Sequence, residues 1–252
     1  MNKLFSFLLT ITLVVAGAQG FAQKKKVAVV TFYVDKHINF SELGGGAALA
    51  ASVGSLADDP NFDLKPILDN FHKVFFEELS KSFPFELIDE GIVTGNEKYK
   101  AYENVGTDAG DEEKGLMQHF LVQDGYKPLI EVNKMSADKF RAELQMLEIF
   151  GDVDGVMFIR LDYSFVKKLA VGGTGSAGMS AFARIKLWNR AGDKVFAKNE
   201  FATSKKSVAI AAGVPVTKPA KILPLCQSAT EKLITDLKKK LPKLAGKIDK
   251  KL

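Results

Sequence analysis

A glycine-rich segment carries a pattern that matches a known phosphate-binding motif. Residues 173–178 read Gly-Thr-Gly-Ser-Ala-Gly, which fits the G-x-G-x-x-G pattern of dinucleotide-binding loops. That chemistry requires a helix directly after the glycines, because the helix N-terminus supplies the amides and the dipole that hold pyrophosphate. The next residues, Met179 to Trp188, alternate between apolar and polar types and so predict a strand. We therefore expect a flexible loop between two strands and no cofactor.

Residues that could bind a metal or act as a nucleophile are isolated in the sequence. His37, His72 and His119 have no partner at ligand spacing, and Cys226 is the single cysteine. Cys226 falls on the apolar stripe of a predicted helix, which indicates a buried, inert thiol. Ser176 lacks the first glycine and the strand-to-helix context of a nucleophile elbow. The sequence therefore predicts no metal site and no catalytic residue.

One strand carries a set of residues suited to partner binding. Phe182, Arg184, Lys186 and Trp188 share the more polar face of the predicted strand from Met179 to Trp188. Trp and Arg are typical anchors of protein interfaces. We take these four residues as a candidate partner-binding patch, and the alternative is that helices cover this face as well.

The C-terminal segment is strongly basic. Residues 218–252 hold ten lysines and three acidic residues, whereas the formal net charge of the whole chain is +5. Such a segment is attracted to anionic surfaces in a salt-dependent way. Candidates for weak contact with an anionic membrane surface are Lys238, Lys239, Lys240 and Lys243; the alternative is a solvated helix face. We expect no nucleic-acid partner, because no aromatic residues alternate with these lysines.

Residues 1–22 have the parts of a secretory signal peptide. Lys3 is followed by an apolar segment from Leu4 to Val15, and Gly20 and Ala22 are the small residues expected before a cleavage site at Gln23. We predict export, to a periplasm or out of the cell. No cysteine follows the apolar segment to accept a lipid, and no later stretch approaches the roughly 18 to 20 apolar residues of a membrane span.

Hydrophobic periodicity predicts one α/β (α+β) domain over residues 23–241, with a mixed β-sheet of about five strands packed by helices. Insertions are expected at about 34–65 and 92–133, the second with short helices, and a basic C-terminal tail at 242–252. The expected order is strand 27–33, helix 66–81, strand 85–88, helix 136–150, strand 157–165, strand 179–188, strand 194–204 and helix 222–237. The turn between the last two strands contains Gly192, where a positive φ is expected.

This order resembles the small α/β domains of the TolB amino-terminal and CsgG-like group of bacterial envelope proteins. The residues that carry the resemblance are the strand 27–32, the helix 66–81, the segment 85–89, the strand 155–165, the glycine-rich crossing and the hairpin around 189–193. The resemblance implies an accessory or assembly role in the envelope and supplies no catalytic residues. The chain differs from the lipoprotein members because it lacks their acylated cysteine.

The sequence thus predicts an exported, non-enzymatic envelope protein that binds or helps assemble another envelope component, or associates with itself. One alternative is an exported hydrolase whose active site is assembled from dispersed residues. Another is binding to an anionic surface through the Lys-rich C-terminus.

Overall fold

The computed structural model describes residues 24–43, 56–103, 117, 119–131, 138–171, 174–211, 214–215, 219–248 and 252. The predicted signal peptide, residues 1–22, lies outside this range. So do Gly173 of the glycine-rich motif and residues 44–55 of the first expected insertion.

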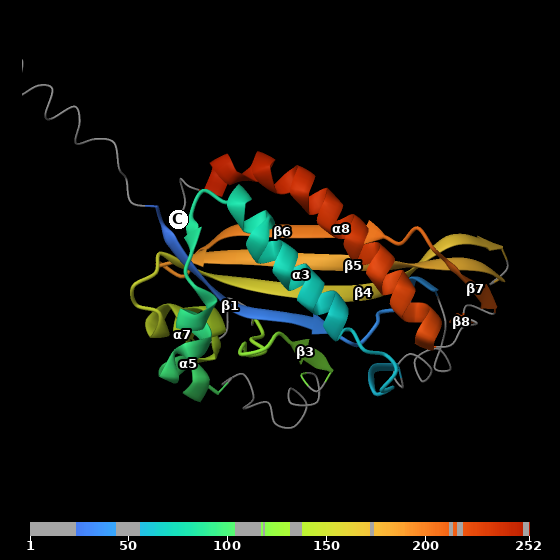
Figure 1. Cartoon of the computed structure of the whole chain (residues 1–252), viewed down its shortest axis with the longest axis horizontal. Helices are drawn as coiled ribbons and strands as arrows, with labels where there is room; N and C mark the ends of the chain where they lie inside the picture. The colour runs from blue at the N-terminus through green and yellow to red at the C-terminus, as the bar shows by residue number, and fades with distance from the viewer. Residues whose placement is uncertain are drawn as a thin grey trace, which may run out of the picture.

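The described chain forms one mixed β-sheet, which confirms the predicted α/β class (Figure 1). Its main path runs β2-β1-β4-β5-β7-β8, with β3 paired to β1 and β6 paired to β5. β1 is parallel to β2 and β4, whereas β5 is antiparallel to both of its neighbours β4 and β6. The strands are β1 (Lys26–Asp35), β2 (Glu86–Leu87), β3 (Phe120–Val122), β4 (Gly155–Val171), β5 (Thr174–Asn189), β6 (Lys194–Thr203), β7 (Val208–Ala211) and β8 (Val214–Pro215).

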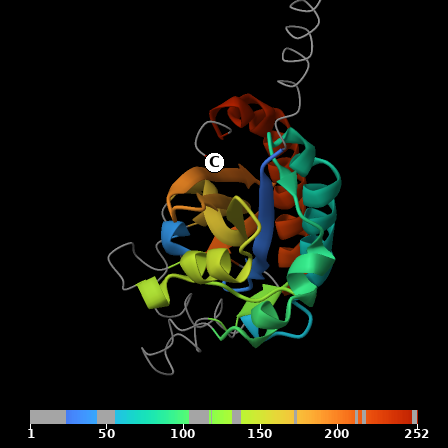
Figure 2. The same ribbon diagram turned by 90° about the vertical axis from the view of Figure 1, so that its left-hand side faces the viewer.

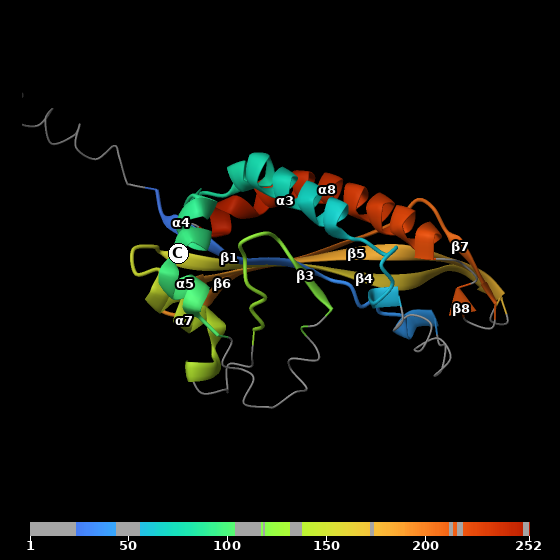
Figure 3. The same ribbon diagram turned by 60° about the horizontal axis from the view of Figure 1, so that its bottom comes forward.

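Two long helices, α3 (Lys65–Glu77) and α8 (Pro219–Ile248), lie side by side across one face of the sheet (Figures 1 and 3). Pro66 sits in the first turn of α3, where its missing N–H costs no hydrogen bond. The shorter helices α4 (Glu90–Gly95), α5 (Glu97–Ala101) and α7 (Ala142–Ile149) gather around one end of the sheet (Figure 2). The 3₁₀ turns are η1 (Ser41–Leu43), η2 (Leu79–Ser82) and η4 (Asp138–Phe140).

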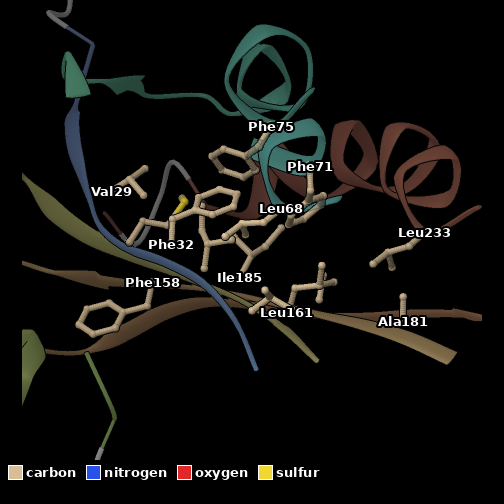
Figure 4. Packing of buried hydrophobic residues seen from close by; sticks show 14 of the residues in the cluster. Val29, Phe32, Leu68, Phe71, Phe75, Phe158, Leu161, Ala181, Ile185 and Leu233 are labelled. Carbon is tan, nitrogen blue, oxygen red and sulfur yellow. The ribbon is translucent and has the colours of Figure 1, made fainter. Parts of the chain in front are cut away.

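The core lies between the two long helices and the sheet face beneath them (Figure 4). Along β4 the alternate residues 157, 159, 161, 163 and 165 are all buried, as the period-two pattern predicts. Leu68, Phe71 and Phe75 of α3 are buried at helical spacing, and the rings of Phe71 and Phe75 lie 5.6 and 5.9 Å from that of Phe32 on β1. Ala181 and Ala183 present only methyl groups under α8, which is consistent with its close approach to the sheet. The opposite sheet face carries Arg160 and Asp162 of β4 and Phe182 and Arg184 of β5, and we call it the open face.

The glycine-rich segment is a strand where the structure describes it, so the expected loop is wrong for residues 174–178. Thr174 to Gly178 belong to β5 and pair with Val166 to Val171 of β4. The neighbouring strand provides a full ladder, which overrides the weak strand propensity of glycine and serine. No helix follows the glycines, so the requirement for dinucleotide binding is not met. The positive φ expected at Gly192 is confirmed at 75°.

The last helix is longer than its predicted range. α8 continues to Ile248, so most of the expected tail at 242–252 is helical although Pro242 lies within it. Leu241 and Ile248 are buried, because they continue the apolar stripe at a spacing of seven residues. The strands β3, β7 and β8 were not predicted; each has two to four residues, too few for a periodic pattern.

Candidate binding groove on the open sheet face

A groove of about 520 Å³ opens on the open face beside β1, β4, β5 and β6. Successive residues of a strand point to opposite faces, so every second residue of β4 and β5 reaches the groove: 160, 162, 164 and 166 from β4, and 180, 182 and 184 from β5. The lining residues are Asp35, His37, Asn39, Glu42, Arg160, Asp162, Tyr163, Ser164, Val166, Ser180, Phe182, Arg184, Phe201 and Thr203.

The floor of the groove is an ion-pair network centred on Asp162. Arg160 donates from Nε to Asp162 Oδ1 at 2.6 Å and pairs through Nη2 with Asp35 Oδ2 at 3.1 Å. The other Asp162 oxygen, Oδ2, lies 3.3 Å from Arg184 Nε, although neither of these two atoms makes a hydrogen bond. Asp162 therefore compensates two guanidinium groups on neighbouring strands.

Aromatic rings position the first of these guanidinium groups. Arg160 lies 5.6 Å from the ring centre of Tyr33 and 5.4 Å from that of Phe120, and the two rings stack at 4.6 Å. Burial raises the pKa of the Asp35 carboxyl above its usual value, while the backbone amide of His37 and the charge of Arg160 act in the opposite direction. Burial also raises the pKa of Tyr33 to about 12. Arg160 is thus held between two carboxylates and two aromatic rings.

Arg184 is held less tightly and faces the groove. Its guanidinium lies 5.1 Å from the ring centre of Phe182, and 43% of its side chain is exposed. Among the described residues, no hydrogen bond is found for its Nη1 and Nη2 atoms. Phe182 stands directly opposite Phe201 on β6, and Phe201 is 64% exposed. The groove therefore offers a cation supported by one aromatic ring, next to a second ring that is open to solvent.

The predicted partner-binding patch is divided by the structure. Phe182 and Arg184 line the groove, and Lys186 lies just beyond it, paired with Glu131. Trp188 is 4% exposed and packs edge-to-face on Phe158 with ring centres 4.8 Å apart. The assignment of Trp188 to the partner-binding patch is wrong, because its ring is buried against Phe158 and does not reach the surface.

Of the groove residues, the sequence predicted only Phe182 and Arg184 as binding residues; the missed ones include Asp35, Arg160, Asp162 and Phe201. A signal was available for two of them, since Arg160 and Asp162 occupy the polar positions of a strand whose other face is entirely apolar. Asp35 and Phe201 gave no comparable signal. Only the pairing of β1 with β4 and of β5 with β6 brings them to the same face.

The basic candidates on α8 differ in their surroundings. Lys238 pairs with Glu78 at 2.7 Å, and Lys240 pairs with Glu200 at 2.6 Å. Lys239 and Lys243 are exposed, and no ion pair is found for them within the described residues. Part of this charge is therefore used to attach α8 to the rest of the fold.

The groove contains titratable groups, but they are arranged in ion pairs rather than as a nucleophile with its base. Asp35 and Asp162 both pair with Arg160, and the Ser164 hydroxyl donates to the carbonyl of Phe165. Among the described residues, no group of three His, Cys, Asp or Glu side chains could hold a metal ion. The arrangement suits recognition by charge, hydrogen bonds and aromatic contact.

Comparison with known proteins adds no relative: no family model matches the chain, and no curated protein matches it. None of the described helices combines the length and low polarity needed to cross a membrane.

Proposed function

We propose that this chain is an exported, non-enzymatic protein of the bacterial cell envelope that binds another envelope component in the groove of its open sheet face. Export is supported by the signal-peptide pattern of residues 1–22. An envelope role is supported by the resemblance of the element order to TolB amino-terminal and CsgG-like domains. Binding is supported by the charged, hydroxyl and aromatic side chains that line the groove.

The observation that carries the proposal is the position of Arg184 over Phe182, beside Phe201. A guanidinium that rests on a ring keeps its outer N–H groups directed away from the ring, where a carboxylate or carbonyl of a partner can accept them. The exposed Phe201 ring adds apolar area within the same groove. Interfaces depend on a few such aromatic and arginine anchors.

The proposal is tested by site-specific crosslinking in cells. A photoreactive amino acid replaces Phe201, and the same amino acid replaces Ile92, which is 60% exposed on α4, as a matched control. We expect a reproducible adduct with an envelope component from position 201 and none from position 92. In the protein that carries the photoreactive amino acid at position 201, Arg184→Ala should abolish the adduct, whereas Lys239→Ala should leave the adduct unchanged. Equal adducts from both positions, or an adduct insensitive to Arg184→Ala, would contradict binding in the groove.

Export is tested separately by fractionating the cells and determining the N-terminus of the protein. We expect the protein outside the cytoplasm with Gln23 as its first residue. A cytoplasmic protein that retains Met1 would contradict export without deciding whether the groove binds a partner.

A further inference from the structure

The sheet extends beyond its helical cover at one end. Past Phe165 and before Met179, β4 and β5 continue as a two-stranded ribbon, and β7 and β8 pair alongside it. Figure 1 shows this part of the sheet projecting past the start of α8. We call it the arm; it comprises residues 166–171, 174–178, 208–211 and 214–215.

A β-bulge turns the apolar side chains of the arm toward the open face. The register of β4 shifts between Lys167 and Leu169, so that Leu169 pairs with Ser176 and Val171 pairs with Thr174. One extra residue moves all later side chains to the opposite face. Without the bulge, Leu169 would face the side on which Ala177 is buried. With it, Leu169 is 71% exposed and Val171 is 81% exposed.

The bulged residue is fixed in place by its own side chain. Lys168 Nζ donates to the backbone carbonyls of Ser204, Lys205 and Lys206 at 2.6, 2.9 and 2.9 Å. These three bonds tie the ribbon to the chain that leaves β6. The outward position of Leu169 and Val171 is therefore built into the fold and does not result from a loose loop.

The arm contains no acidic residue and is flanked by exposed lysines, while Glu42 lines the groove together with Val166 at the base of the arm. Residues 163–192 and 201–230 include no Asp or Glu at all. Lys167, Lys205, Lys206 and Lys221 are exposed there, and within the described residues none of them forms an ion pair. Exposed apolar side chains next to unpaired lysines are complementary to an anionic membrane surface, where a hydrocarbon layer lies beneath anionic headgroups.

We propose that the arm inserts Leu169 and Val171 into an anionic phospholipid surface while the neighbouring lysines contact the headgroups. A lipid surface fits better than a protein partner, because the arm carries neither the aromatic residues nor the arginines that anchor protein interfaces. The contact differs from the one expected for the lysines of α8, since it depends on apolar insertion as well as charge. It also leaves the groove residue Arg184 outside the lipid contact.

The test measures binding of the purified protein to vesicles of phosphatidylethanolamine and phosphatidylglycerol, with phosphatidylcholine vesicles as the neutral comparison. We expect binding to the anionic vesicles only. The double variant Leu169→Ser/Val171→Ser should bind at least tenfold more weakly, and Lys205→Gln/Lys206→Gln should bind more weakly at low salt. The matched control Ile92→Ser removes an exposed apolar side chain elsewhere and should bind like the unchanged protein. Thermal unfolding of each variant confirms that it folds.

A second measurement locates the contact directly. Cys226 is fully buried, so it does not compete when an environment-sensitive fluorophore is attached to a new cysteine in the folded protein. The label at Val171→Cys should shift to shorter wavelength with anionic vesicles, and the label at Ile92→Cys should not. No shift at position 171 would overturn the proposal.

Two further outcomes would also overturn it. Vesicle binding lost on Lys239→Gln/Lys243→Gln but kept in the arm variants would assign the contact to α8. An absence of vesicle binding, together with a crosslinked protein at position 171 in cells, would assign the arm to a protein partner. Arg184→Ala should leave vesicle binding unchanged, so a failure of the arm proposal is distinguishable from a failure of the groove proposal.

Discussion

Arg160 and Arg184 occupy directly opposite positions on β4 and β5, with the carboxylate of Asp162 between them. Like charges that face each other across a sheet repel. Asp162 offsets this repulsion because each of its oxygens lies against a different guanidinium. The stability of the ion-pair network therefore depends more on Asp162 than on either arginine.

Replacing Asp162 should destabilise the fold through that repulsion. We expect Asp162→Asn to lower the free energy of unfolding by about 2 kcal/mol, less than for a fully buried pair because Arg184 is partly exposed. Adding Arg184→Gln should restore part of the loss, since only one guanidinium then remains. Urea unfolding of the single and double variants measures the coupling. Strictly additive effects would show that the two arginines do not interact through Asp162.

The hydroxyl of Tyr99 should hold the segment 123–131 against β1. It donates to the Val30 carbonyl and accepts from the Lys127 amide, each at 2.8 Å, at the point where the β1 register shifts. Tyr99→Phe leaves both backbone groups unpaired in a buried site, so we expect a loss of about 1–3 kcal/mol. Amide hydrogen exchange should quicken in residues 123–131. Unchanged exchange there would contradict this role.

Gly155 should tolerate no side chain. A Cβ at this position would lie 2.5 Å from the backbone oxygen of Trp188, and the strand ladder prevents that atom from moving. We expect Gly155→Ala to cost about 2 kcal/mol or more through displaced backbone. Gly95→Ala is the control, because nothing lies within 4 Å of its added methyl group. Thermal unfolding should separate the two variants, and equal melting temperatures would contradict the expected clash.

Glu200 should make the stability of the fold sensitive to acid. Burial alone would raise the pKa of this carboxyl, but its ion pairs with Lys198 and Lys240 outweigh burial and lower the pKa below 4.5. A carboxyl with a lowered pKa stabilises the folded state above its unfolded pKa and loses that contribution as the pH falls through its folded pKa. Glu200→Gln should therefore lower the free energy of unfolding at pH 7. At pH 3 the free energies of unfolding of the variant and of the unchanged protein should differ less than at pH 7. Urea midpoints across this range test the sign; a constant difference would contradict it.

Several elements could be predicted because short-range patterns determine them. The alternation from Met157 to Phe165 and the helical spacing of Leu68, Phe71 and Phe75 each depend on one buried face, and both predictions are confirmed. The strand from Thr174 to Gly178 was missed because its residues have weak strand propensity and form a ladder only when β4 lies beside them.

The candidate site was only partly predictable for a related reason. Phe182 and Arg184 share one strand, so their common face follows from the period of two residues. Their groove partners Asp35, Asp162 and Phe201 lie on three other strands, and no local pattern relates these residues. Trp188 fits the same period but is buried by packing that no single strand reveals.

By itself, the sequence determined the apolar faces, the turn at Gly192 and the absence of acidic residues in 163–192 and 201–230, because these depend on residue type and local spacing. The tertiary structure decided which strands are neighbours and where their registers shift. The pairing of β4 with β5 places Asp162 between two arginines. The register shift at Lys168 turns Leu169 and Val171 toward solvent. Pairing between distant strands is a long-range property, since the buried area and the hydrogen bonds of the whole sheet select it together.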